Sequence, residues 1–207
     1  SVGIRATFVP PALGLPRADE AWLAAFSEGF FALAERHGVD LIGGDTTRSE
    51  RITICVTALG EVPSGVAMYR ATARPDDDIW VSGELGSAAL ALSLSAQSHP
   101  AQSHPDFAAA AAKLHQPEPR VELGERLRGL ARAAIDVSDG LAGDLQHILE
   151  RSHVGAVIRY ADIPRLAAFA QLNDRELEKD CVLSGGDDYE LVFTAARERR
   201  KEIEALS

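Results

Sequence analysis

The feature that most constrains this chain is an acidic junction at residues 134–145, AIDVSDGLAGDL. A short apolar run passes there directly into a helical pattern, which predicts a strand followed at once by a helix. Asp136, Ser138 and Asp139 should therefore gather at one strand-to-helix turn. Carboxylates placed so close together repel one another, and an opposing cation is the natural compensation.

Two interpretations of this junction are open. Mg²⁺ takes oxygen ligands and often uses one or two carboxylates together with phosphate oxygens, so Asp136 and Asp139 are candidate ligands. Ser138 and the backbone N–H groups at the helix start would then face an anion. In the alternative, Ser138 or Asp139 is simply the N-cap of the helix. The junction alone does not decide between them.

Two further glycine turns carry acids. Gly43-Gly44-Asp45-Thr46-Thr47 follows an apolar run at 39–42 that predicts a buried strand, and LSGGDDYEL at 183–191 precedes a predicted strand at 191–193. Paired glycines let a backbone approach a ligand closely, whereas ordinary turn hydrogen bonding explains the same residues without one. A fourth turn, at 83–87, is either a phosphate nest at a helix start or an ordinary turn.

Composition limits the class of protein. The chain has 207 residues, of which 46% are hydrophobic and 25% charged, as in a globular protein with one large or two small domains. A formal net charge of −10 argues against nucleic acid as the main partner. No apolar run is long enough for a membrane span, and no signal peptide is recognisable. With Cys55 and Cys181 in no metal-binding pattern, we expect a cytoplasmic protein.

Periodicity predicts the main elements. A helix at 18–37 should place Trp22, Phe26 and Phe30 in a core, and a half-buried strand is expected at 52–56, which suggests an α+β unit ending near residue 65. We also expect helices at 121–133 and 195–206 and a strand at 156–160. The chain starts without Met in a strand-like run and stops in a helix without a cap, so both ends look cut. The tandem His99 and His104 repeats are predicted to be a surface loop.

Three motifs in this order, LIGGDTT at 41–47, IDVSDGL at 135–141 and LSGGDDYEL at 183–191, resemble the thiamine-monophosphate kinase family. That family belongs to the aminoimidazole ribonucleotide synthase-like superfamily. The resemblance implies a two-domain α+β architecture with mixed and antiparallel sheets, divided here into residues 1–66 and 67–207, in a homodimer. It also implies ATP-dependent phosphorylation of thiamine monophosphate to thiamine diphosphate with Mg²⁺.

The resemblance assigns roles residue by residue. Magnesium ligands are implied at Asp45, Asp136 and Asp139, and nucleotide contacts at Gly44, Asp45, Arg70 and Ser138. Asp187 matches an acidic position that contacts the thiamine substrate, where the family often has glutamate. No side chain is implied as a catalytic base, and direct in-line transfer fits this, since an acceptor phosphate with a second pKa of about 6 is already ionised near neutral pH.

Two departures qualify the resemblance. Members of the family begin with acidic segments that supply further metal ligands and continue to an aromatic residue near the substrate, and neither region matches this chain. We therefore expect the middle of the enzyme. Two alternatives stay open: another ATP-dependent enzyme of the superfamily with a different acceptor, or a non-catalytic nucleotide-binding domain.

Overall fold

The computed structural model describes residues 5–8, 11–95, 105–172 and 174–206. By the contacts within the chain, it divides into a small unit, Ile4–Gly65, and a large unit that contains Val66–Ser207. The domain boundary expected between residues 66 and 67 stays a prediction. The tandem repeats with His99 and His104 lie outside the described residues. No helix in the described part of the chain has the length and apolar character that a membrane span requires.

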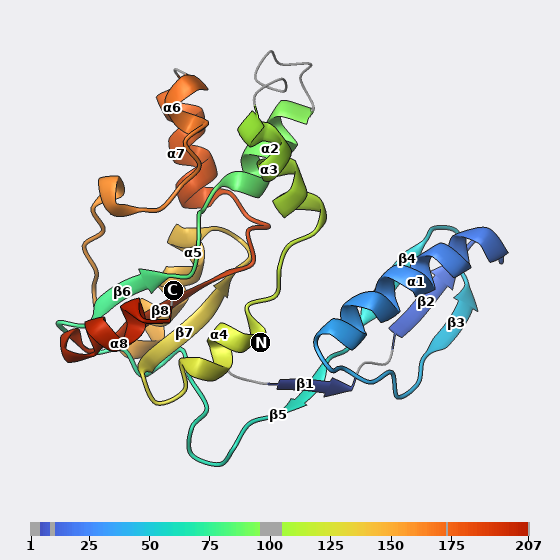
Figure 1. The fold of residues 1–207 in the computed structure, drawn as a ribbon, viewed down its shortest axis with the longest axis horizontal. Coiled ribbons are helices and arrows are strands. Elements are labelled where there is room, and N and C mark those ends of the chain that lie inside the picture. The colour runs from blue at the N-terminus through green and yellow to red at the C-terminus, as the bar shows by residue number, and fades with distance from the viewer. Residues whose placement is uncertain (1–4, 9–10, 96–104, 173, 207) are drawn as a thin grey trace. The chain divides into compact units, whose positions relative to one another are not determined.

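The small unit combines one helix with short strands (Figure 1). Helix α1, Glu20–Arg36, begins after Asp19, whose carboxylate accepts a hydrogen bond from the Trp22 backbone N–H at 3.1 Å. Strand β2, Pro11–Leu15, lies between β3, Asp45–Arg48, and β4, Thr53–Val56. It is parallel to β3 and antiparallel to β4, so this sheet is mixed. Strands β1, Arg5–Phe8, and β5, Leu59–Glu61, form a separate antiparallel pair.

The structure corrects several expectations for the small unit. The run 39–42 forms no strand, and β3 begins instead at Asp45, after the paired glycines. Strand β2 was not predicted, because prolines at 10, 11 and 16 surround it. Proline is nevertheless tolerated at the first position of a strand, where Pro11 stands. Strand β4 is exposed along its length rather than half-buried.

The aromatic side chains of α1 form a stripe rather than a core. Trp22 stacks on Phe26 with ring centroids 5.3 Å apart, and Phe26 on Phe30 at 6.0 Å. No residue of α1 is buried, so the expected core placement is wrong. Within the small unit, the described elements leave Trp22, Phe26 and Phe30 only half-buried.

The large unit is built on the antiparallel sheet β6-β8-β7. Its strands are β6, Asp78–Val81; β7, Ala131–Val137; and β8, Glu190–Ala195. Its helices are α2, Ser87–Ser95; α3, Pro105–His115; α4, Val121–Arg126; α5, Leu141–Ser152; α6, Phe169–Leu172; α7, Arg175–Ser184; and α8, Arg200–Glu204, with short 3₁₀ turns at Tyr160–Asp162 and Arg197–Arg199. A mixed sheet in one unit and an antiparallel sheet in the other confirm the predicted α+β class.

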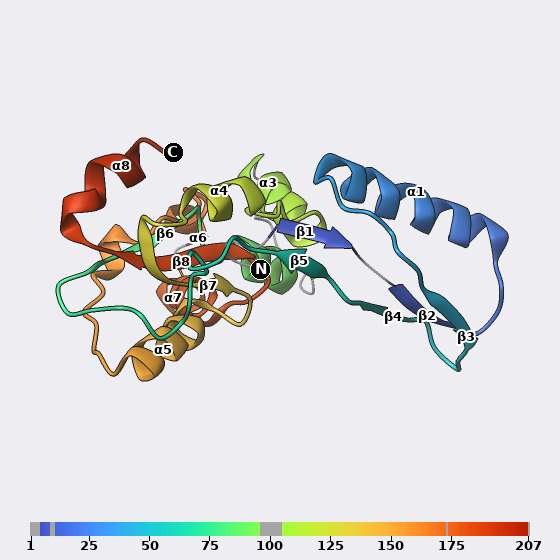
Figure 2. The same cartoon turned by 90° about the horizontal axis from the view of Figure 1, so that it is seen from below.

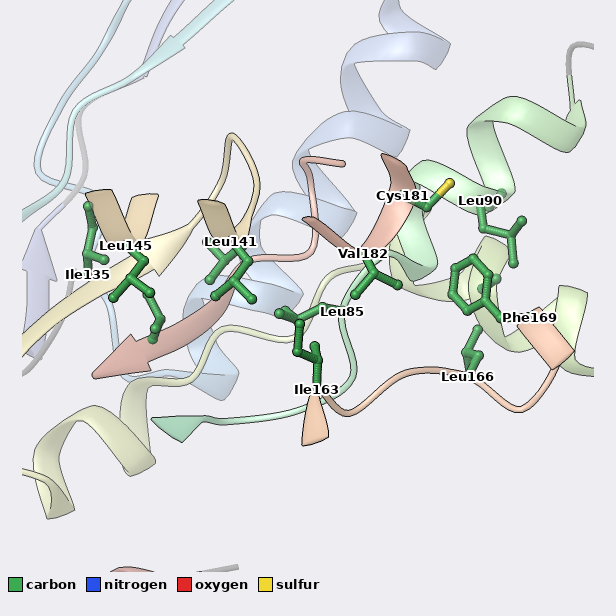
Figure 3. Packing of buried hydrophobic residues seen from close by; sticks show 14 of the residues in the cluster. Leu85, Leu90, Ile135, Leu141, Leu145, Ile163, Leu166, Phe169, Cys181 and Val182 are labelled. Atoms are coloured by element: carbon green, nitrogen blue, oxygen red, sulfur yellow. The ribbon is translucent and has the colours of Figure 1, made fainter. Parts of the chain in front are cut away.

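Side chains alternate across the sheet of the large unit, as the two-residue period of a strand requires. Ile135 and Val192 face a core shared with α2, α5 and α7, whereas Ala134 and Phe193 face a smaller core under α4 and α8. Helices accordingly cover both faces of the sheet (Figure 2). Leu141 and Leu145 of α5 enter the larger core, where α5 packs against β7 (Figure 3). This packing fixes where β7 ends and α5 begins.

Two further expectations for the large unit are wrong. The helix expected at 121–133 stops at Arg126, because the chain turns at Gly129 with φ +79° and Ala131 already starts β7. Residues 156–160 form no strand, and Val157 is 93% exposed. Apolar alternation fits a strand at 156–160, but a strand also needs a neighbour that pairs with its backbone.

Candidate functional site

The acidic junction and the 183–191 motif form two turns joined by hydrogen bonds. The Asp187 backbone N–H donates to the Ser138 carbonyl at 3.0 Å, and the Tyr189 N–H donates to the Val137 carbonyl at 2.9 Å. Gly140 adopts φ +113°, and a Cβ there would lie 2.7 Å from the Ser184 carbonyl carbon. Only glycine fits without strain. Residues 49 and 52 positions apart in the sequence are thereby held together where β7 ends and β8 begins.

The contacts of Asp144 show which groups cap the turn between β7 and α5. Its side-chain Oδ2 accepts hydrogen bonds from the Ser138 and Asp139 backbone N–H groups, each at 2.9 Å, and the residue is 3% exposed. The N-cap of α5 is Gly140, and no side chain caps it. The interpretation of Ser138 or Asp139 as an N-cap is therefore wrong. Asp144 thus occupies the backbone N–H groups of Ser138 and Asp139, whereas the expectation that the Ser138 side chain and the N–H groups at the start of α5 face an anion stays a prediction.

The Asp136 and Asp139 carboxylates are left free by this arrangement. Asp136 is half-buried and Asp139 exposed, and neither carboxylate has a hydrogen bond or ion pair with any described residue. Asp187 is exposed beside them and accepts a hydrogen bond from the Tyr189 hydroxyl at 3.1 Å. That hydrogen bond, together with partial burial and the charges of Asp187, Asp136 and Asp139, raises the pKa of Tyr189. Three negative charges thus act on one hydroxyl.

The neighbouring acids of the 183–191 motif are structural. Asp188 is 5% exposed and accepts hydrogen bonds from the backbone N–H groups of Gly86, at 2.6 Å, and Ala88, at 3.2 Å. Burial raises the pKa of Asp188 although both hydrogen bonds act to lower it. Gly86 of the 83–87 turn and Ala88 in the first turn of α2 therefore already donate to Asp188, which favours the ordinary-turn interpretation over a phosphate nest.

Glu190 is the second buried acid of this motif. Its carboxylate accepts two hydrogen bonds from the Arg120 guanidinium, at 2.7 and 2.6 Å, and one from the Ser82 hydroxyl. Burial acts to raise the pKa of Glu190, but the hydrogen bonds from Arg120 and Ser82 outweigh it and hold the pKa below its ordinary value. The pair anchors the start of β8 to the loop before α4.

The other predicted site residues belong to segments of the chain outside these two turns. Arg70 is exposed, and its guanidinium has no hydrogen bond or ion pair with the described residues. Its carbonyl accepts a hydrogen bond from the Ser152 hydroxyl at 3.0 Å, and the preceding Tyr69 bridges to Ala133 of β7. Gly44 and Asp45 belong to the small unit, where Asp45 opens β3 and is exposed.

The donor set suits magnesium bound together with a ligand. Within the described ranges, no three His, Cys, Asp or Glu side chains come close enough to hold a metal ion by themselves. Asp136 and Asp139 nevertheless offer hard oxygen donors that no ion pair with a described residue neutralises. Magnesium commonly takes one or two carboxylates and completes its shell with phosphate oxygens and water, so these residues fit it.

Comparison with known families gives this geometry a context. The family described as AIR synthase related protein, C-terminal domain, matches residues 74–206, and the corresponding N-terminal domain matches residues 1–62. The chain belongs to the AIR synthase related protein family.

Within this family, the chain is similar to thiamine-monophosphate kinases. It is 38% identical to the enzyme of Haemophilus influenzae over 204 residues, which are 99% of this chain and 62% of the relative. The crystal structure of thiamine-monophosphate kinase from Stenotrophomonas maltophilia K279a superposes with a TM-score of 0.93 at 47% identity, covering 99% of this chain and 66% of that one. The structure of AaThiL complexed with AMPPCP and TMP has a TM-score of 0.86 at 28% identity, covering 96% and 64%. The chain thus spans about 62% of the length of its curated relatives.

For this member of the AIR synthase related family, sequence reasoning missed Asp144, Asp188 and Glu190 as site residues. All three are buried acids that brace the two turns. The helical pattern gave one usable signal: Asp144 lies three residues after Leu141 and four residues before Ile148, so it shares the apolar side of the predicted helix. Nothing in the sequence identified the partners Gly86 and Arg120, which are distant along the chain.

Proposed function

We propose that this chain carries part of an ATP-dependent kinase that phosphorylates thiamine monophosphate to thiamine diphosphate by direct in-line transfer. The observation that carries the proposal is the similarity to a thiamine-monophosphate kinase over 99% of this chain, with a TM-score of 0.93 and 47% identity. The free carboxylates of Asp136 and Asp139 support it from the chemistry side, because phosphoryl transfer depends on positioning and charge neutralisation.

We assign the roles as follows. Asp45, Asp136 and Asp139 would hold magnesium, which, when bound, offsets negative charge on the ATP phosphates. Gly44, Asp45, Arg70 and Ser138 would contact the nucleotide. The Ser138 hydroxyl has no hydrogen bond with any described residue, so it is available for a phosphate oxygen. The guanidinium of Arg70, which pairs with none of the described residues, would add a fixed positive charge.

Asp187 would orient the acceptor. It is exposed, it stands next to the free carboxylates in the two joined turns, and it carries the charge that a cationic thiazolium ring favours. No general base is assigned, since the acceptor phosphate is largely ionised near neutral pH, with a second pKa of about 6. A cytoplasmic location stays a prediction.

We also propose that the protein is a homodimer. The small unit exposes apolar side chains along and beside β4, among them Ile54 at 44% and Val56 at 48%. A second copy that covers them would remove this apolar surface from water. Sedimentation equilibrium tests the dimer: Ile54→Glu should yield monomer, and a wild type that is monomeric at micromolar concentration would contradict it.

The kinase assignment is tested by measuring thiamine diphosphate formed from thiamine monophosphate, ATP and Mg²⁺. This chain is compared with a form extended at both ends by the corresponding segments of a longer relative. Product that requires ATP and Mg²⁺ supports the proposal. Tight ATP binding without any product would favour the non-catalytic nucleotide-binding alternative. ATP hydrolysis stimulated by a different acceptor would favour another enzyme of the superfamily.

A further inference from the structure

Tyr189 has an unusual backbone and an exposed side chain. It adopts φ +51°, and Asp187, two residues before, adopts φ +66°. The left-handed region is uncommon for residues other than glycine, and such strain concentrates at functional sites. Tyr189 is nevertheless 44% exposed and packs in neither hydrophobic cluster of the described residues. Core packing therefore does not explain why a tyrosine occupies this position.

The strained turn separates two pairs of side chains. Asp188 and Glu190 point inward, where the backbone N–H groups of Gly86 and Ala88 hold Asp188 and the Arg120 guanidinium holds Glu190. Asp187 and Tyr189 remain on the exposed side, where the Tyr189 hydroxyl donates to Asp187 Oδ1 at 3.1 Å. The Tyr189 N–H donates to the Val137 carbonyl, which holds the backbone of Tyr189 next to the acidic junction.

We propose that Tyr189 is a positioning residue of the acceptor site: its hydroxyl holds the Asp187 carboxylate in the orientation that contacts the acceptor. This inference rests on the proposed kinase function and on the role of Asp187 in it. Asp187 lies at an exposed turn and has no other hydrogen bond from a side chain of the described residues, so its rotamer depends on Tyr189. A carboxylate held in one rotamer loses less entropy on binding than a freely rotating one.

Tyr189→Phe tests the inference, because it removes the hydroxyl and keeps the ring. In the kinase-active form of the protein, the KM for thiamine monophosphate should rise about tenfold, as expected for losing one hydrogen bond to a charged group. The KM for ATP should not change. The dissociation constant of thiamine monophosphate, measured by calorimetry with Mg²⁺ and a non-hydrolysable ATP analogue, should weaken by the same factor.

Tyr160→Phe is the matched control. The Tyr160 hydroxyl also donates to a carboxylate at 3.1 Å, that of Glu178, but it lies outside the two turns. This variant should leave both KM values unchanged. In an Asp187→Ala background, Tyr189→Phe should cause no further loss, because the tyrosine acts through that carboxylate.

The outcomes separate this inference from the function on which it rests. A wild type that neither binds nor phosphorylates thiamine monophosphate overturns both. An active wild type with an unchanged acceptor KM in Tyr189→Phe overturns only the positioning role, as does an equal rise in the KM for ATP. Additive losses in the Asp187→Ala background would mean that the tyrosine contacts the acceptor directly, which also overturns it.

Discussion

Asp144 and Asp139 belong to the same acidic junction, and the structure predicts different consequences for their loss. Asp144 is buried and accepts two backbone hydrogen bonds, whereas Asp139 is exposed and its carboxylate has no partner among the described residues. We expect Asp144→Ala to destabilise the large unit. Asp139→Asn should leave stability almost unchanged and remove phosphoryl transfer.

The magnitudes follow from these contacts. A hydrogen bond to a charged group contributes about 1.5–3 kcal/mol. Because both hydrogen bonds are only partly buried, the lower value applies to each of them, and alanine returns roughly 0.5 kcal/mol through its helix propensity. The net loss for Asp144→Ala is therefore about 2.5 kcal/mol. For Asp139→Asn we expect a change within about 0.5 kcal/mol and a rate loss of about 100-fold or more.

Urea unfolding measures the stability difference. Trp80 stacks on Phe193 in the sheet of the large unit, with ring centroids 6.4 Å apart, so its fluorescence reports on that unit. A Trp22→Phe background removes the signal of the small unit. If Asp139→Asn lost as much stability as Asp144→Ala while the folded fraction kept its activity, Asp139 would be a structural cap and the metal assignment would fail.

Three further predictions concern stability and reactivity. The pKa of Glu190 lies below its ordinary value, so the stability that its ion pair contributes is complete above about pH 4.5 and is lost as the pH falls through the folded-state pKa. Glu190→Gln should cost about 3 kcal/mol at pH 7, and this gap should narrow below pH 4.5 in urea titrations. Gly140→Ala should cost about 2 kcal/mol or more in thermal unfolding, because its φ of +113° and a close backbone resist a Cβ, whereas Gly143→Ala, with open space, should stabilise α5 by about 1 kcal/mol. Burial raises the pKa of Cys181 to about 11, so iodoacetamide at pH 8 should label exposed Cys55 alone in the native protein and both cysteines in denaturant; native labelling of both would contradict this.

Several elements followed from local patterns. The apolar spacing and the acidic first turn predicted α1 nearly to its ends, and the junction at 134–145 was correctly predicted as a strand followed by a helix. The three motifs also led to the correct family. These features depend on residues within one turn or one strand of each other, so a single sequence carries them.

Other features depend on contacts between distant segments. The run at 156–160 has the alternation of a strand but pairs with none in the described residues, and the aromatic stripe of α1 has a core pattern without enough chain over it. Period and propensity describe what a segment can bury. They do not describe what is present to cover it.

The sequence by itself determined that acids cluster in three glycine turns and that phosphate and metal chemistry suits them. Only the tertiary structure decided which acids are free for that chemistry. Among the described residues, no group pairs with the Asp136 and Asp139 carboxylates, whereas Asp144 and Asp188 accept hydrogen bonds from backbone N–H groups and Glu190 from a guanidinium. A carboxylate looks the same in every motif, and its role depends on whether a donor from another part of the chain reaches it.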